Sequence, residues 1–257
     1  MPAGPREETI VAIYSTLAHI WGPQHWWPAT SRFEVIVGAY LTQNTSWSNV
    51  EIALTNLRTA RVLSLDGIRG IPRPRLEKLI RSSGYFRQKA RNLKTFVKFL
   101  DSNYGGSLTR MFAQPTAVLR EQLLGLNGVG PETADSILLY AGQHSVFVVD
   151  AYTRRLASRH GILDENADYE QFRVVFEKAL AATPPVRSST MDFPTRGHAS
   201  HRPSRMSLAR REPLVQVFNE MHGLIVSAGK QYCLKSKAQC EQCPLGPLLP
   251  QGHFPRI

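Results

Sequence analysis

The sequence predicts an all-α protein, and three observations carry that prediction. Apolar residues recur at helical spacing in four separate segments, whereas the alternation typical of half-buried strands is scarce. A turn with two glycines joins two apolar helical segments within residues 123–141. The run 146–149 is β-branched and aromatic, but no second strand-like run accompanies it, so we expect an extended lead into a helix.

The four apolar helical faces follow one another along the chain. They consist of Phe33, Ile36, Val37, Tyr40 and Leu41; Leu93, Phe96, Val97 and Leu100; Phe172, Val175, Phe176 and Leu180; and Phe218, Met221, His222 and Ile225. Residues 183–213 interrupt the pattern with five prolines and six arginines against two acids. Such a segment buries little apolar surface, so we expect a flexible insertion, either passive or able to grip phosphates.

Composition narrows the class of protein and of partner. The 257 residues suffice for one large domain or two modest ones. No apolar run approaches the ~20 residues of a membrane span, and the first residues lack a signal-peptide pattern, so we expect a cytoplasmic protein with no membrane partner. Lys and Arg number 31 against 20 Asp and Glu, a net charge of +11. This excess favours a polyanionic partner, although solubility alone gives the same signature.

The turn at Gly128 and Gly130 predicts a helix–hairpin–helix motif. Glycine lets the chain turn tightly and lets a ligand approach the bare backbone. Pro131 suits the first position of the following helix, because the N–H that it lacks has no helical partner there. The free N–H groups at this helix start fit one DNA phosphate without reading sequence. An ordinary helical hairpin remains the alternative.

Asp150 stands twenty residues after Gly130, at the end of the apolar run. An aspartate at a helix start is commonly an N-cap. A helix–hairpin–helix followed at this distance by Val-Val-Asp also resembles the signature of the endonuclease III, or helix-hairpin-helix-GPD, superfamily of DNA glycosylases. The loop of that signature is here 142–144, which contains no proline. The resemblance implies that Asp150 is the catalytic carboxylate, which stabilises an oxocarbenium-like sugar and orients water as the base departs.

Other segments resemble the same superfamily at positions that contact DNA. The segment "LTQNT" implies that Gln43, with Asn44 beside it, enters the gap left by a flipped base. A polar residue at a helix C-terminus is the alternative for Gln43. The segment "GYFRQKARNL" implies phosphate contacts by Lys89 and Arg91. Arg154, in the segment that follows Val-Val-Asp, is also expected to contact DNA.

Glu132 bears on the type of reaction. Endonuclease III itself has a catalytic lysine two residues past the second glycine of the hairpin, and Glu132 holds that position here. A carboxylate cannot form a Schiff base, so we expect base excision without strand cleavage. The resemblance further implies that Glu132 faces the base pocket near Asp150, where two carboxylates favour a cationic base. Its ordinary role is to complement the helix dipole.

The tryptophans point to a class of base. Trp26, Trp27, Pro28 and Trp47 resemble the stacking slot of the 3-methyladenine branch of the superfamily. Aromatic faces attract cations, and a cationic base is already a good leaving group. The sequence therefore predicts excision of an alkylated purine such as 3-methyladenine. Lys230, in "VSAGKQYC", aligns with a lysine near the active site of that branch, or is a solvated lysine at a helix end.

All three cysteines lie near the C-terminus, at Cys233, Cys240 and Cys243. Their spacing resembles the first three ligands of the endonuclease III [4Fe–4S] cluster, but Leu249 holds the fourth position. One expectation is therefore a [4Fe–4S] cluster whose fourth ligand is His253, water or an external thiol. Zinc held with the help of His253 is a second, and a metal-free relic is a third.

The resemblance also implies an architecture. We expect a six-helix barrel domain near 31–142 that includes the hairpin, a second domain from 1–30 and 143–257, and a DNA cleft between them. The expected partner is double-stranded DNA with a damaged base, bound by a monomer. Two alternatives stay open. One is a glycosylase and lyase that acts on oxidised pyrimidines, and the other is a catalytically silent DNA-binding module in which Asp150 is only a cap.

Overall fold

The computed structural model describes residues 4–185 and 203–250. The chain divides into two compact units: unit 1 comprises 1–28 and 145–257, and unit 2 comprises 29–144, where the sequence predicts a barrel at 31–142. Every regular element in the described ranges is helical and none is a strand, as predicted for the all-α class. No helix in those ranges is both long enough and apolar enough to cross a membrane.

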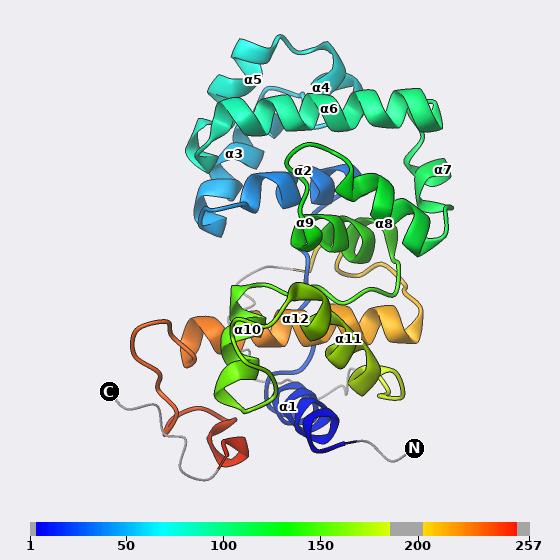
Figure 1. The fold of residues 1–257 in the computed structure, drawn as a ribbon. Coiled ribbons are helices and arrows are strands. Elements are labelled where there is room, and N and C mark those ends of the chain that lie inside the picture. Colours follow the sequence, from blue (N-terminus) through cyan, green and yellow to red (C-terminus); the bar gives the residue numbers. More distant parts are fainter. Residues whose placement is uncertain (1–3, 186–202, 251–257) are drawn as a thin grey trace. The chain divides into compact units, whose positions relative to one another are not determined.

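Unit 2 is built around a helix that is buried on all sides (Figure 1). Its elements are α2 (Arg32–Thr42), α3 (Trp47–Thr59), α4 (Leu65–Gly70), α5 (Arg73–Leu79), η1 (Arg81–Ser83), α6 (Phe86–Tyr104), α7 (Leu108–Phe112), α8 (Thr116–Leu124), α9 (Pro131–Ser136) and the π-helical η2 (Ile137–Gly142). From Phe33 to Leu41 every residue of α2 is buried, and α3, α6, α9 and η2 contact this helix. The core of unit 2 therefore fixes the end of α2, where Gln43 lies.

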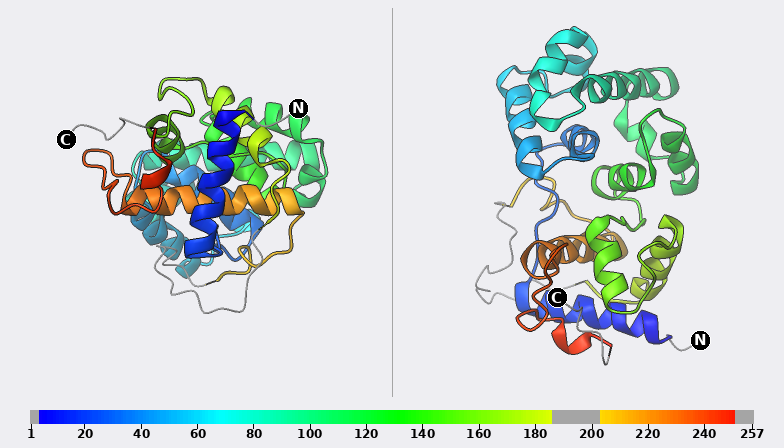
Figure 2. Two further views of the ribbon diagram at one scale, coloured as in Figure 1. Left: turned by 90° about the horizontal axis from the view of Figure 1, so that it is seen from below. Right: turned by 60° about the vertical axis from the view of Figure 1, so that its left-hand side comes forward.

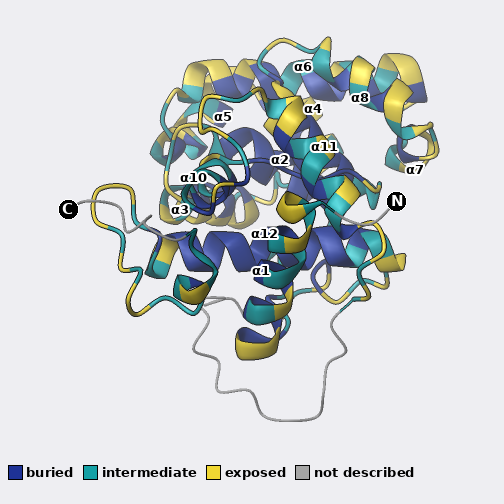
Figure 3. Ribbon diagram, turned by 60° about the horizontal axis from the view of Figure 1, so that its bottom comes forward, coloured by how far each residue is buried: buried dark blue, intermediate teal, exposed yellow. Residues whose placement is uncertain are grey.

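Unit 1 is built in the same way around its last long helix. Its elements are α1 (Pro5–Trp21), α10 (Ala151–Arg159), α11 (Tyr169–Leu180), α12 (Pro213–Gln231) and η3 (Gly246–Leu248). From Val217 to Gly229 every residue of α12 is buried, which Figure 3 shows as a nearly continuous dark ribbon. Helices α1, α10 and α11 contact it, and Figure 2 shows α1 crossing it. The apolar face predicted for this helix is thus only part of its buried surface.

The run 146–149 is neither helix nor strand and leads directly into α10. Two side chains of α11 satisfy two of its backbone donors. Phe147 N–H donates to Glu177 Oε1 at 2.9 Å, and Val149 N–H donates to the Tyr169 hydroxyl at 3.3 Å. Buried backbone groups need such partners, and here they come from side chains instead of a neighbouring strand. The run therefore delivers the next residue, Asp150, to the start of α10.

The predicted flexible insertion 183–213 lies largely outside the described residues, which omit 186–202. Its described last part, 203–212, consists of turns and loop, as the composition indicates. Ser204 Oγ donates to the Trp27 carbonyl at 3.1 Å, and an Arg211 Nη donates to the Met206 carbonyl at 2.6 Å. Met206 and Ser207 are nevertheless buried, which the composition does not indicate. The flexibility of the insertion stays a prediction.

Candidate active site

Asp150 is the N-cap of α10 and the first residue of the candidate site. Its Oδ1 accepts hydrogen bonds from Thr153 N–H at 2.8 Å and from Thr153 Oγ1 at 3.0 Å. Its Oδ2 lies 3.5 Å from Nε2 of His222 on α12, and the side chain is 14% exposed. One carboxylate oxygen caps the start of α10, and the other faces His222. The capping role and a chemical role therefore do not exclude each other.

His222, which the sequence assigns only to an apolar helical face, is the partner of Asp150. Burial acts to raise the pKa of Asp150. The charge and hydrogen bond of His222, with the two hydrogen bonds from Thr153, outweigh burial and lower that pKa below its ordinary value. A sheltered carboxylate that stays ionised can stabilise developing positive charge. The only signal for His222 in the sequence is a titratable residue within an otherwise apolar face.

A buried polar network fixes the segment after α1 onto α12. Gln24 N–H donates to Glu220 Oε2 at 2.7 Å, and Ser227 Oγ donates to Gln24 Oε1 at 2.8 Å. Gly223 lies beneath the same segment. A Cβ on Gly223 would lie 2.9 Å from Cβ of Gln24 and 3.2 Å from Cβ of Trp26. The segment therefore reaches its position because residue 223 has no side chain.

The segment places Trp26 beside the carboxylate–imidazole pair. The Trp26 and His222 ring centroids are 6.0 Å apart with an interplanar angle of 64°, and Trp27 packs edge-on against Trp26 at 5.7 Å. Trp27 is buried, whereas Trp26 and Pro28 are half-buried. Trp26 is thus the aromatic residue that packs against His222, the partner of Asp150, and the buried Trp27 packs against Trp26 in turn.

Lys230 is exposed in the last turn of α12. It lies eight residues past His222, which is about 12 Å along the helix axis. The adjacent Gly229 packs against the ring of Tyr152, where an added Cβ would overlap ring atoms. The predicted place of Lys230 in the base pocket stays a prediction.

In unit 2, helices α8 and α9 form the predicted hairpin, and Gly128 fixes its turn. The φ of Gly128 is +80°, and an added Cβ would overlap the side-chain amide of the buried Asn92. Gly130 is the N-cap of α9, and a Cβ there would meet nothing within 4 Å. Open backbone at a helix start is the surface that the phosphate hypothesis requires. The phosphate contact itself stays a prediction.

Gln43 ends α2, and its side chain is tied to the hairpin. Its Nε2 donates to the Gly128 carbonyl at 2.9 Å and to Thr133 Oγ1 at 2.8 Å. The next residue, Asn44, is exposed and has a φ of +52°. Gln43 must release two hydrogen bonds before it enters DNA, whereas Asn44 is already exposed. The role of either residue in filling the gap left by a flipped base stays a prediction.

Lys89 is buried on α6 and is only 2% exposed. Its Nζ donates to the carbonyls of Leu41 at 2.9 Å, Gln43 at 2.8 Å and Ser83 at 2.6 Å. Burial lowers the pKa of Lys89 to about 8. The structure contradicts the predicted phosphate contact, because the ammonium group instead caps the C-terminal end of α2. Arg91, two residues further on, is exposed.

Arg154 is held by groups of its own unit. Its Nη1 donates to the Ala167 carbonyl at 2.6 Å, and its guanidinium carbon lies 4.9 Å from the centroid of the Phe172 ring. These contacts fasten the loop between α10 and α11. They favour a structural role for Arg154 over the predicted DNA contact.

Glu132 and Trp47 belong to unit 2, whereas Asp150 and Trp26 belong to unit 1. Glu132 is the exposed second residue of α9, where a carboxylate complements the helix dipole. Trp47 is the half-buried first residue of α3. A base pocket that joins these four residues stays a prediction.

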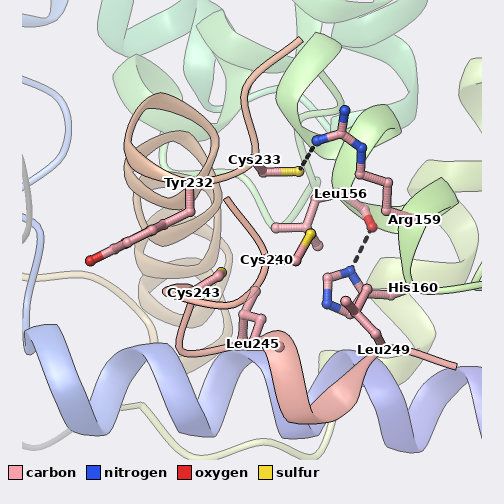
Figure 4. Close-up of a pocket in the computed structure, with 10 residues that line it drawn as sticks. Leu156, Arg159, His160, Tyr232, Cys233, Cys240, Cys243, Leu245 and Leu249 are labelled. Atoms are coloured by element: carbon pink, nitrogen blue, oxygen red, sulfur yellow. Dashed lines mark hydrogen bonds between the residues drawn. The ribbon is translucent and has the colours of Figure 1, made fainter. Parts of the chain in front are cut away.

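The cysteines lie around a separate pocket in unit 1 (Figure 4). Burial raises the pKa values of the Cys240 and Cys243 thiols. Cys233 and Leu249, which holds the fourth position of the spacing, line the same pocket. His253, the predicted substitute ligand, lies outside the described residues. Within 4–185 and 203–250, no three His, Cys, Asp or Glu side chains converge closely enough to hold a single metal ion.

Comparison with known proteins gives one family match and a close relative in sequence. Residues 37–182 match a family described as HhH-GPD superfamily base excision DNA repair protein. A protein of Methanocaldococcus jannaschii that is named as a DNA repair glycosylase is 41% identical over 241 residues, which are 93% of this chain and 94% of that protein. The family match includes both the hairpin and Asp150.

Two solved structures share the fold. The H. pylori 3-methyladenine DNA glycosylase bound to 1,N6-ethenoadenine has a TM-score of 0.67 and 29% identity, covering 88% of this chain and 97% of that one. Endonuclease III trapped as a covalent intermediate with DNA has a TM-score of 0.68 and 21% identity, covering 98% of each chain. The second likeness concerns the fold alone, whereas the first extends to the sequence.

Proposed function

Because the chain belongs to the HhH-GPD superfamily of base excision DNA repair proteins and is a DNA glycosylase, we propose that it excises alkylated purines by hydrolysis alone. The observation that carries this proposal is the group of Asp150, His222 and Trp26, an ionised carboxylate paired with an imidazole that packs against an aromatic side chain. An aromatic face attracts a cationic base, and a carboxylate stabilises the positive sugar that remains when the base leaves.

The two carboxylate oxygens of Asp150 have different roles. Thr153 holds Oδ1, so Oδ2 is the atom that faces the developing charge and the attacking water. The C1′–N bond breaks with its electrons returning to the base, so a purine that is already cationic leaves as a neutral molecule without a strong acid. Water then adds to C1′, and its proton passes to Oδ2. His222, 3.5 Å from Oδ2, is a positioning residue for the carboxylate.

The absence of lyase activity is proposed from the hairpin. A Schiff base needs an amine nucleophile, and the side chain two residues past Gly130 is the carboxylate of Glu132. The relative from H. pylori supports the class of base, because its name specifies 3-methyladenine and it was solved with a modified adenine bound. That relative is 29% identical over 88% of this chain.

Five duplexes test the proposal with the full chain. They carry 3-methyladenine, 1,N6-ethenoadenine, uracil, an oxidised pyrimidine or an abasic site, and free base is quantified separately from nicked strand. We expect release of free alkylated purine, strands that stay intact until alkali treatment, and no adduct with the abasic duplex in borohydride. Nicking with covalent trapping contradicts the proposed lack of lyase activity. Release of pyrimidines alone contradicts the proposed class of base.

The charge of the base is tested by Glu132→Gln. If Glu132 faces the pocket, the variant should slow release of cationic 3-methyladenine more than release of neutral 1,N6-ethenoadenine, because one carboxylate no longer attracts the cation. Glu121→Gln is the matched control, since Glu121 is an exposed carboxylate on the preceding helix α8. Equal slowing of both bases by Glu132→Gln assigns Glu132 to the helix dipole alone.

A further inference from the structure

The cysteine pocket has walls from α10, from the end of α12 and from the loop that follows α12 (Figure 4). Three of the side chains that line it are the thiols of Cys233, Cys240 and Cys243. Three thiols are one ligand short of the usual complement of a [4Fe–4S] cluster. Leu249, at the fourth position of the spacing, cannot ligate iron. A fourth donor atom from the wall of this pocket must therefore belong to another residue.

His160, the C-cap of α10, offers such an atom to the pocket. Its Nδ1 lies 2.9 Å from the Leu156 carbonyl, which can only accept, so Nδ1 carries the proton. In the neutral ring, Nε2 then keeps a free lone pair. Nε2 is buried and has no hydrogen-bond partner among the described residues. Figure 4 shows the ring at the wall of the pocket, with its second nitrogen turned inward.

This arrangement is the one that ligand histidines adopt. A histidine that binds a metal donates its other ring N–H to a carbonyl or carboxylate, which fixes the tautomer and the ring orientation. The Leu156 carbonyl fills that role for His160. A buried polar atom without a partner is also rare in native proteins and needs an explanation. A bound metal on Nε2 supplies one.

The turn that carries His160 adjoins the segment where the spacing has its missing thiolate. A Cβ on Gly161 would lie 3.2 Å from Cγ of Pro250, so this turn packs directly against the residue after Leu249. Leu249 and His160 both line the pocket. The imidazole therefore enters from the side on which the fourth cysteine is expected.

The donor types in this wall are those that iron–sulfur clusters accept. Cys233, Cys240, Cys243 and His160 all line one hollow. Cysteine thiolates are the usual ligands of such clusters, and histidine replaces cysteine in some iron–sulfur centres.

We propose that Nε2 of His160 is the fourth ligand of a [4Fe–4S] cluster held by Cys233, Cys240 and Cys243. Arg159 supports the thiolate form of the set, because its Nη1 donates to Sγ of Cys233 at 3.1 Å. A neutral imidazole in place of a thiolate leaves the cluster with one negative charge fewer. Histidine ligation raises the reduction potential of iron–sulfur centres for this reason.

The test uses the full chain purified without oxygen. Iron, acid-labile sulfide and zinc are counted per chain, the cluster is reduced with dithionite, and pulsed EPR measures coupling to nitrogen. We expect about four irons and four sulfides per chain. We also expect a strong nitrogen coupling that changes to the ¹⁵N pattern when only histidine is ¹⁵N-labelled. A chain that binds zinc alone or no metal overturns the proposal, and so does a four-iron cluster without histidine coupling.

Variants identify the histidine. His160→Leu should lose the coupling and the fourth iron, whereas His253→Leu, a change four residues after Leu249 in the sequence, should change neither. Leu249→Cys should keep four irons, lose the coupling and lower the reduction potential, because a thiolate replaces the imidazole. Adding Leu249→Cys to His160→Leu should restore the fourth iron, which shows that the single variant folds.

The competing interpretation is a structural histidine whose ring lies near the carbonyls of Leu156 and Leu245. It predicts a coupling that persists in His160→Leu or disappears in His253→Leu, and either result overturns the proposal. His144→Leu controls for loss of a partly buried imidazole as such. His144 belongs to unit 2, and its Nε2 also has no hydrogen-bond partner among the described residues.

Discussion

Replacing Lys89 with methionine should lower the free energy of unfolding and leave the salt dependence of DNA binding unchanged. Lys89 is buried, and its ammonium group donates hydrogen bonds to the carbonyls of Leu41, Gln43 and Ser83. Methionine keeps most of the side-chain volume and removes the donors. The variant therefore isolates the contribution of the ammonium group from that of packing.

The expected loss of stability follows from two opposing contributions. Each of the three carbonyls left without a donor costs about 1–3 kcal/mol. Burial lowers the pKa of Lys89 from 10.5 to about 8, which corresponds to about 3 kcal/mol against the charged form at neutral pH. Methionine has no charge, so it also removes the free-energy cost of keeping a buried ammonium group charged. We expect a net loss of about 2–3 kcal/mol at neutral pH.

The same pKa gives a pH dependence with a definite sign. Between about pH 8 and pH 10.5 the folded chain has released the Lys89 proton while the unfolded chain retains it. The unfolded state then binds more protons, so the Lys89 contribution to stability rises with pH in this window and falls again toward pH 8. The difference in unfolding free energy between wild type and Lys89→Met should widen by about 2 kcal/mol from about pH 7.5 to about pH 9.5.

Urea unfolding at both pH values measures the stability, and titration with a labelled duplex at several salt concentrations measures the binding. One phosphate contact contributes about 0.9 to the slope of log K against log salt. Arg91→Met is the matched control, an exposed cation two residues further along α6. The reasoning is refuted if Lys89→Met unfolds within about 0.5 kcal/mol of wild type and lowers the slope by about 0.9.

Four further substitutions test the hairpin and the candidate site. Gly128→Ala should lower the free energy of unfolding by at least about 1 kcal/mol, since the φ of Gly128 is +80°. Gly130→Ala should keep the free energy of unfolding within about 0.5 kcal/mol of wild type and yet weaken DNA binding. Urea unfolding measures the first effect, and duplex titration measures the second. Gly223→Ala should displace the aromatic segment and slow excision by up to about 100-fold, measured in single-turnover assays on a chain shown to be folded. His222→Asn should move the acid limb of the pH–rate profile upward, because His222 lowers the pKa of Asp150; an unmoved limb contradicts the pairing.

The parts that sequence predicts well are those encoded within a few residues of one another. The glycines and the proline of the hairpin restrict or extend the allowed backbone conformations by themselves. The positive φ of Gly128 agrees with the tight turn expected there. An aspartate that follows an apolar run and precedes a helical segment is a common N-cap, and Asp150 is the N-cap of α10. The apolar periodicity of 33–41 and 93–100 likewise predicts α2 and α6, because a core-facing helix needs no distant partner to define its buried side.

The parts that sequence misses depend on distant partners. Lys89 reads as a surface cation, yet it meets carbonyls that lie up to 48 residues away along the chain. His222 reads as a core residue, because nothing near it in sequence reveals that Asp150 packs against it. In both cases the side chain contacts a partner that lies far away in the sequence, which no local pattern specifies.

The central claim is that Asp150 drives hydrolysis of the glycosidic bond, and one comparison tests it most directly. Single-turnover release of 3-methyladenine is measured for wild type, Asp150→Asn and Asp168→Asn. Asp168 is the N-cap of α11 and is exposed, so its variant matches the capping change without the site. Asparagine caps a helix about as well as aspartate, so both variants should stay folded. We predict a loss on the order of 10²–10³-fold for Asp150→Asn alone, with intact strands throughout. Equal rates in both variants would contradict the account.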